Sequence, residues 1–366
     1  MRSIRILRRA LPILFLLLVI LAGFIRSLNL GGVEPRVVVV RPVFTAAAYS
    51  GYPDYSFYAF FKKFSNNPEN SIVKTDLHLL NTLVREDDWG KSRTIPTFLS
   101  WQNAGFLKDP PIITDIEVND GKLFDTDGNR QYDVALLGFT EYVSQQEYSN
   151  YKHFVERGGR LFLLDACNFL AEVNYNHSTN TVSLVKGKGW EFNGTAARKA
   201  VYHRWYAENT NWVGSNFRFL HSDESYEIYG AIPNATHPLG RFLQTTIGPR
   251  VFTSYRAHEE NIVTNSSVKI IASWTILGNL KNSGVTVAMY EHYYQKGSVI
   301  HTGISGSDII ATDPKMQFFL HQAIQQLTHP DYHSSVWNLS RETAFCHTHI
   351  RFSLHPFSSH HFKSHD

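Results

Sequence analysis

The chain has 366 residues, with 35 lysines and arginines against 32 aspartates and glutamates, which gives a formal net charge of +3. Hydrophobic residues make up 43% of the chain and charged residues 18%, a balance that excludes a wholly disordered protein. The near-neutral charge also argues against a dedicated nucleic-acid-binding protein, which would carry a strong basic excess. The two cysteines, Cys167 and Cys346, are too few for a disulfide scaffold.

The N-terminus predicts a membrane-targeting segment. Arginines crowd the first nine residues, and an apolar run follows from Ala10 to Ile25. About 16 helical residues span roughly 24 Å, slightly less than a bilayer core of about 30 Å, but Arg9 and Arg26 can reach the two interfaces. We interpret residues 1–30 as a signal anchor with one transmembrane helix, and a cleaved signal peptide is the alternative. The rest of the chain is then extracytoplasmic, tethered to the membrane or secreted.

Glycosylation sequons support an extracytoplasmic location if the organism glycosylates. Their asparagines are Asn176, Asn193, Asn234, Asn265 and Asn338.

The clearest fold signal is a βαβ unit that begins at Tyr132. The run Asp133–Gly138 is continuously apolar after its leading aspartate, which is typical of a strand covered on both faces. Ser144 and Glu147 have the spacing of a capping box, and Gly158-Gly159 ends the helix that follows. The next buried strand is Leu161–Asp165. A strand, a helix and a strand at this spacing predict a parallel sheet.

Weaker patterns surround this unit. Before it we expect a strand at Val37–Val40 that continues through Val43–Tyr49 into a loop, and a helix at Tyr55–Phe64. After it, residues 169–267 alternate short β-branched and aromatic runs with turn residues, which predicts a β-rich insertion.

The α/β pattern resumes near the C-terminus. Val285–Tyr290 and Ser298–Thr302 are predicted strands, and Asp313 caps a predicted helix from Pro314 to about Leu327. We therefore expect one α/β domain over residues 31–330, followed by a histidine-rich and disordered tail over residues 331–366.

Several of these segments together resemble a known family. They are the loop Ala48–Gly51, the run Tyr132–Tyr142 (Y-D-V-A-L-L-G-F-T-E-Y) before a capped helix, the helix end at Gly158-Gly159, and a strand end at Asn168. The order resembles the C-terminal domain of the N,N-dimethylformamidase large (beta) subunit over roughly Val37 to Asn168. The resemblance implies a flavodoxin-like three-layer sandwich, in a divergent branch of the class I glutamine-amidotransferase-like fold.

The same resemblance implies a site and an activity. In that family a mononuclear iron, held by two tyrosines and a glutamate, activates water to hydrolyse an amide. The metal ligands would be Tyr49 and Glu141, and Asn168 would lie beside them. Phe139 stands where the family has a histidine, and Phe139 can neither bind metal nor move a proton. The second tyrosine ligand is not assigned, because Tyr52, Tyr55 and Tyr58 lie nearby but outside any matching motif.

Other candidates follow from the residues alone. Cys167 follows a buried strand, where a nucleophile could lie, but its neighbours are not small, so we interpret it as an inert thiol. Glu291 and His292 follow a predicted strand and form a candidate acid/base pair; the alternative is a solvated strand end. The turn at Asp125–Asn129 lacks the closing glutamate of a calcium loop.

Two function classes remain open. One is a metal-dependent hydrolase of amide carbon–nitrogen bonds, with Glu141, Asn168, Glu291 and His292 as catalytic residues. The other is a non-catalytic domain that binds a small molecule or a partner in the same cleft, and Phe139 favours this second class.

Overall fold

The structure is a computed structural model that describes the chain in twelve stretches. They are residues 35–49, 57, 81–84, 110–188, 203–222, 229–246, 248, 253–254, 257–263, 265–276, 286–302 and 314–328. All belong to one unit, residues 1–329, whereas the second unit, 330–366, contains the predicted tail and lies outside the described residues. The predicted signal segment, residues 1–30, and most of the predicted helix Tyr55–Phe64 also lie outside them. Among the residues described, no helix is long and apolar enough to cross a membrane.

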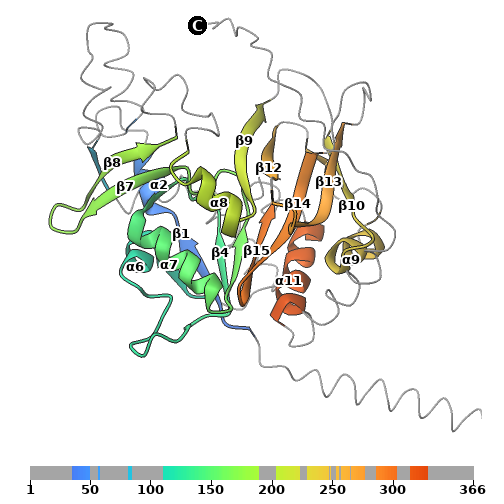
Figure 1. Ribbon diagram of the computed structural model, residues 1–366, viewed down its shortest axis with the longest axis horizontal. Coiled ribbons are helices and arrows are strands. Elements are labelled where there is room, and N and C mark those ends of the chain that lie inside the picture. Colours follow the sequence, from blue (N-terminus) through green and yellow to red (C-terminus); the bar gives the residue numbers. More distant parts are fainter. Residues whose placement is uncertain are drawn as a thin grey trace, which may run out of the picture. The chain divides into compact units, whose positions relative to one another are not determined.

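The centre of the fold is a mixed sheet of nine strands in the order β11-β10-β13-β14-β15-β6-β4-β1-β3 (Figure 1). Five neighbours are parallel: β3 (Ile112–Thr114), β1 (Val37–Arg41), β4 (Val134–Leu137), β6 (Arg160–Leu163) and β15 (Gly297–Thr302). The others add antiparallel pairs: β14 (Thr286–Tyr294), β13 (Lys269–Ile276), β10 (Tyr229–Pro233) and β11 (Thr253–Ser254). The protein is therefore a mixed α/β fold, and the carboxyl ends of β1, β4 and β6 meet at one edge of the sheet.

The predicted βαβ unit is confirmed. Helix α7 (Gln145–Glu156) joins β4 to β6. Its capping box is complete, because the Ser144 hydroxyl accepts the Glu147 N–H at 2.9 Å and the Glu147 carboxylate accepts the Ser144 N–H at 3.2 Å. Gly158 ends the helix with φ of +97°, a conformation that glycine adopts without strain.

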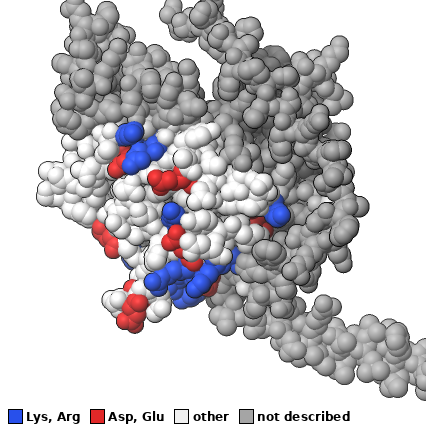
Figure 2. Space-filling view, in the orientation of Figure 1, with Lys and Arg blue, Asp and Glu red and all other residues white. Residues whose placement is uncertain are grey.

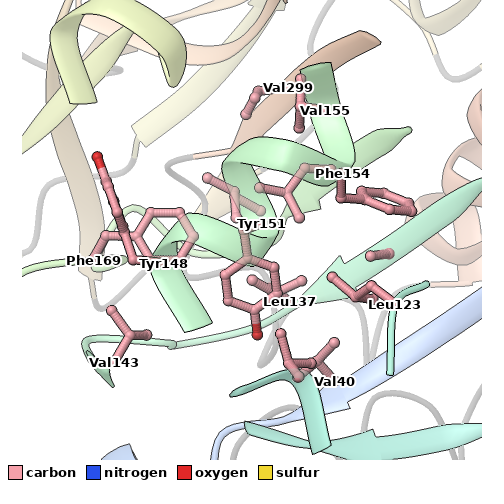
Figure 3. Packing of buried hydrophobic residues seen from close by; sticks show 14 of the residues in the cluster. Val40, Leu123, Leu137, Val143, Tyr148, Tyr151, Phe154, Val155, Phe169 and Val299 are labelled. Carbon is pink, nitrogen blue, oxygen red and sulfur yellow. The ribbon is translucent and has the colours of Figure 1, made fainter. Parts of the chain in front are cut away.

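Helix α7 buries its apolar face against the parallel strands. Tyr151 and Phe154 point from the helix toward the strands that carry Leu137 and Val40, in a fully buried cluster (Figure 3). The short helix α6 (Asp115–Asn119) packs beside α7 and against β1 and β3. Because β4, β6 and β15 are buried at every position, both faces of the parallel sheet are covered.

The segment after β1 corrects one prediction. We expected Val43–Tyr49 to continue the strand into a loop, but Val43–Ala48 is a helix, α2. Pro42 ends the strand, and the Asp115 carboxylate accepts the Phe44 N–H at 2.8 Å in the first turn of the helix. That acceptor comes from a segment 71 residues away, so the local pattern of apolar residues did not reveal it.

The region predicted as a β-rich insertion contributes to all three sheets. Strands β7 (Ala171–Asn176) and β8 (Thr181–Gly187) join β5 (Tyr142–Ser144) and β2 (Asn81–Leu83) in a four-stranded sheet. Strands β9 (Ser215–Ser222) and β12 (Ala257–Val263) pair with each other, whereas β10 and β11 extend the main sheet.

The later elements follow the predictions closely. Strands β14 and β15 correspond to the two predicted C-terminal strands, and helix α11 (Pro314–Thr328) begins at the predicted proline. Helices α8 (Tyr206–Trp212) and α9 (Pro238–Thr246) lie within the region predicted as the insertion.

On the face shown in Figure 2, lysines and arginines lie beside aspartates and glutamates in small mixed groups.

Candidate functional site

Tyr49 and Glu141 meet at the carboxyl edge of the parallel strands. Tyr49 is the C-cap of α2, just after β1, and Glu141 lies in the loop after β4. The Tyr49 hydroxyl donates a hydrogen bond of 2.6 Å to Glu141 Oε2. Glu141 is only 3% exposed, whereas Tyr49 is 37% exposed, so the phenol forms the accessible side of the pair. The structure thus brings together the two residues that the sequence predicts as metal ligands.

A lysine that the sequence analysis did not single out completes this centre. The Lys188 ammonium donates to both Glu141 Oε2 and the Tyr49 hydroxyl, and it lies 4.6 Å from the centre of the Tyr49 ring and 5.1 Å from that of Tyr142. Lys188 is 2% exposed. Burial is the largest single effect and lowers the pKa of Lys188, but the charge of Glu141, the hydrogen bond to it and the charges of Tyr142 and Cys167 together raise the pKa above its usual value. Lys188 is therefore a buried, charged ammonium paired with Glu141.

The backbone at the end of β8 explains how Lys188 reaches this place. Gly187 and Lys188 both have positive φ, +106° and +54°, and this turns the chain sharply after the strand. A Cβ atom on Gly187 would lie 2.5 Å from the Leu170 carbonyl oxygen, so only glycine fits. That carbonyl accepts both the Lys188 N–H at 2.9 Å and the Arg204 N–H at 3.0 Å. Lys188 is thus anchored through its backbone.

Asn168 holds the loop that carries Glu141. Its side-chain oxygen accepts the Thr140 N–H at 3.0 Å, and its amide group donates to the Asp165 carbonyl. The Glu141 carbonyl in turn accepts the Leu170 N–H at 2.9 Å and the Ala171 N–H at 3.0 Å. Asn168 therefore lies next to the Glu141 loop, as expected, and its amide braces that loop.

Phe139 closes the apolar side of the centre. It follows β4, has φ of +51° although it is not glycine, and its ring lies 5.8 Å from the Tyr49 ring. Such a backbone conformation costs roughly 1–3 kcal/mol and is held only where the surroundings fix it. The backbone after β4 therefore fixes the direction in which the side chain at position 139 points, and that side chain is the inert aromatic ring of Phe139.

Cys167 and His203 lie on the side of Lys188. Cys167 is a buried thiol that packs with Leu170 and Phe217, and the His203 ring stacks on Phe217 with 6.1 Å between the ring centres. Burial, and then the positive charge of Lys188, lower the pKa of His203 to about 3, so its imidazole is neutral at pH 7. Neither ring nitrogen of His203 has a hydrogen-bond partner within the described part of the chain, although the residue is only 5% exposed.

Glu291 and His292 lie away from this centre and apart from each other. As neighbours on β14, they point to opposite faces: Glu291 Oε2 lies 3.3 Å from His237 Nε2, and His292 Nε2 lies 2.9 Å from the Asn211 carbonyl. In the sheet, Glu291 pairs with Ile300 of β15, Ile300 pairs with Phe162 of β6, and Phe162 pairs with Leu136 of β4. Glu291 is therefore level with the inside of β4, whereas Glu141 lies in the loop beyond the end of that strand. The structure therefore does not bring this pair together with Tyr49 and Glu141.

The described residues do not fit a mononuclear iron. No group of three or more histidines, cysteines, aspartates or glutamates close enough to hold a metal is present among them, and Tyr52, Tyr55 and Tyr58 lie outside the described residues. The two oxygen ligands at hand, from Tyr49 and Glu141, both contact the Lys188 ammonium. An ammonium has no lone pair with which to bind a metal, and its charge repels a cation.

The sequence does hold a weak signal for the missed lysine. Lys188 stands between two glycines, Gly187 and Gly189, within the region predicted as a β-rich insertion. Glycines at a strand end indicate a close backbone approach, which is what Gly187 makes with Leu170. For His203 the sequence offers no comparable signal, because its position beside Lys188 depends on the pairing of both segments with Leu170.

Comparisons with known proteins agree with the family resemblance. Residues 23–246 match the family described as N,N-dimethylformamidase beta subunit-like, C-terminal. No curated protein sequence matches the chain.

Solved structures share only a loose likeness. The β-galactosidase of Rahnella sp. R3 is 11% identical with a TM-score of 0.42, over 80% of this chain and 31% of that one. A ThuA-like protein from Bacteroides uniformis is 10% identical with a TM-score of 0.42, over 82% of this chain and 95% of that one. The cytoplasmic protein STM1381 from Salmonella typhimurium LT2 is 11% identical with a TM-score of 0.41, over 64% and 86%. This chain thus spans about a third of the galactosidase.

The match to residues 23–246 covers more than half of the chain and includes Tyr49, Glu141, Asn168 and Lys188. The protein therefore belongs to the N,N-dimethylformamidase beta subunit-like, C-terminal family.

Proposed function

We propose that this family member is a membrane-tethered, extracytoplasmic binding domain that holds a small ligand at the centre formed by Tyr49, Glu141 and Lys188. The observation that carries the proposal is the state of Glu141. Its carboxylate is buried and neutralised by Lys188, so it is engaged within the protein rather than open to a metal or a proton. The replacement of the family's histidine by Phe139 supports the same conclusion, since a general acid or base contributes about 100- to 10,000-fold to a reaction.

His203 supports a ligand as the occupant. A buried imidazole without a hydrogen-bond partner costs roughly 1–3 kcal/mol, and such a group calls for a partner that completes it. A small polar molecule beside Lys188 would supply that partner. The ligand would then accept a hydrogen bond from the Lys188 ammonium and form a second one with the neutral His203 imidazole.

The order of the parallel strands supports the fold part of the proposal. Numbered among themselves along the chain, β3-β1-β4-β6-β15 have the order 2-1-3-4-5, which is the flavodoxin-like order. In such sheets ligands bind outside the carboxyl ends of the strands, which is where Tyr49 and Glu141 lie. We propose on this basis the three-layer, glutamine-amidotransferase-like architecture.

A second candidate function is amide hydrolysis. Membership of the family and the retained contact between Tyr49 and Glu141 favour it. In this alternative a mononuclear iron would need the two oxygens that Lys188 now contacts. Position 139 is a phenylalanine, so no imidazole is present there to transfer the proton that cleavage of the carbon–nitrogen bond requires.

The test compares binding and turnover in the full-length protein in detergent. Small carboxylic acids and amides are screened by the shift in melting temperature, and hydrolysis of N-substituted formamides is followed by the amine released. We expect stabilising ligands whose effect is lost in Tyr49→Phe, with no turnover above that of Glu141→Gln. Phe139→His restores the imidazole that the family has at this position, Phe139→Leu is its control, and we expect no turnover from either variant. Turnover by the wild type that Glu141→Gln abolishes would establish hydrolysis and refute the binding role.

A further inference from the structure

Lys188 contacts both of the residues that the family resemblance predicts as metal ligands, Tyr49 and Glu141. Its ammonium contacts Tyr49 and Glu141 at once, and both contacts are made by the same nitrogen atom. We propose that Lys188 is the built-in cation of this site and that it takes the place of the metal, so that the wild-type centre binds no metal ion. This inference rests on the proposed function, because it explains why the centre binds rather than hydrolyses.

The charges of the centre require a cation. Glu141 is 3% exposed, and a buried carboxylate is stable only when it is paired and hydrogen-bonded. Lys188 supplies the positive charge and one hydrogen bond to this carboxylate, and the Tyr49 hydroxyl adds a second at 2.6 Å. The pair is neutral overall without any further ion.

The protonation of Tyr49 is consistent with this arrangement. A tyrosine that binds iron does so as a phenolate, whereas the Tyr49 hydroxyl is the donor of a hydrogen bond to Glu141. The ammonium beside it provides the positive charge, so the phenol can keep its proton. The centre is therefore organised for an ammonium, and a metal would have to displace both that proton and Lys188.

Lys188 cannot move aside easily. Its backbone N–H is bound to the Leu170 carbonyl at 2.9 Å, its φ of +54° follows Gly187 with φ of +106°, and its side chain is 2% exposed. Its ammonium also pairs with the Glu141 carboxylate, whose side chain is 3% exposed and would be left without a counter-charge if Lys188 moved away. The cation is thus fixed in position.

The experiment is a metal titration of the full-length protein in detergent. Ferric and cobaltous ions are added separately, excess metal is removed by gel filtration, and bound metal is counted per chain. Ferric samples are also inspected for the visible charge-transfer band of an iron-bound tyrosinate. Because histidines in residues 331–366 can bind metal on their own, the double variant Tyr49→Phe, Glu141→Gln gives the background.

We expect the wild type and Lys188→Arg to bind no more metal than this background. Two variants remove the charge: Lys188→Gln keeps hydrogen-bonding capacity and Lys188→Met does not. Both should bind metal at least tenfold more tightly than the wild type. Their ferric band should disappear when Tyr49→Phe is added. Circular dichroism confirms that each variant is folded.

Two results would overturn the inference: metal uptake by the wild type that depends on Tyr49 and Glu141, or no gain of metal in either folded neutral variant. The wild-type measurement decides the question even if both neutral variants fail to fold. Amide turnover is a separate readout. Hydrolysis by metal-free wild type would refute the proposed function and leave the role of Lys188 standing.

Discussion

The ion pair of Lys188 and Glu141 should dominate the local stability of the site. Lys188→Met leaves a carboxylate that is 3% exposed without its cation, and Glu141→Gln leaves an ammonium that is 2% exposed without its anion. Breaking a buried pair from one side costs roughly 3–5 kcal/mol. That is a large part of the 5–15 kcal/mol that typically separates folded from unfolded protein. The double variant Lys188→Met, Glu141→Gln removes both charges and should cost less than either single change.

The assay is urea denaturation of the four proteins of this double-mutant cycle. We expect a coupling free energy of roughly 3 kcal/mol that persists when salt is raised, since buried pairs are screened only weakly. The pair Arg36–Asp133, whose side chains are 54% and 30% exposed, is the matched control and should couple by at most about 1 kcal/mol. Single changes at Lys188 and Glu141 that each cost less than about 1 kcal/mol, or a coupling no larger than the control, would refute the reasoning.

Three further predictions concern other parts of the chain. Burial raises the pKa of Glu147 well above its usual value. The stability that this residue contributes is therefore full below about pH 4 and is lost as pH rises through the folded pKa. Urea denaturation from pH 4 to 9 should show a smaller loss of unfolding free energy in Glu147→Gln than in the wild type, and the same dependence of that free energy on pH in both proteins would contradict this. Gly187→Ala should cost roughly 2–3 kcal/mol, because its Cβ would meet the Leu170 carbonyl at 2.5 Å and φ is positive; Gly121→Ala, with φ of +91° and no atom within 4 Å, should cost clearly less in the same denaturation assay. Residues 1–30 should keep the full-length protein in the membrane fraction during carbonate washing, with the domain open to external protease; a soluble protein that has lost this segment would indicate a cleaved signal peptide.

Local sequence patterns were sufficient where an element is defined by its own residues. The capping box of Ser144 and Glu147, the apolar run before it and the glycine at position 158 each specify a structure within a few residues, and β4, α7 and its end follow them. The meeting of Tyr49 and Glu141 was also accessible, because both directly follow predicted elements whose ends lie at one sheet edge.

The remaining features depend on contacts between distant segments. Helix α2 is stabilised by Asp115, 71 residues away, so an apolar segment that favoured a strand became a helix. Lys188 reaches Glu141 across 47 residues through the pairing of β7 and β8 and the turn at Gly187. Glu291 and His292 are adjacent in sequence, yet strand geometry sends them to opposite faces. Composition and spacing do not contain the contacts of Asp115 and Lys188, and the last pair was misread because β14 continues to Tyr294, beyond the predicted strand end at Tyr290.

The Leu170 carbonyl has a consequence for how the chain can be altered. Because this one oxygen accepts the amide hydrogens of both Lys188 and Arg204, it pins together the two ends of the segment between them. The free energy of holding two points of a chain together rises by only about 0.6 kcal/mol for each doubling of the length of chain between them. A peptide tag, a spectroscopic probe or a binding sequence added between these two anchors should therefore leave Lys188 in its position, because its hydrogen bond to Leu170 does not depend on the length of chain that separates the anchors.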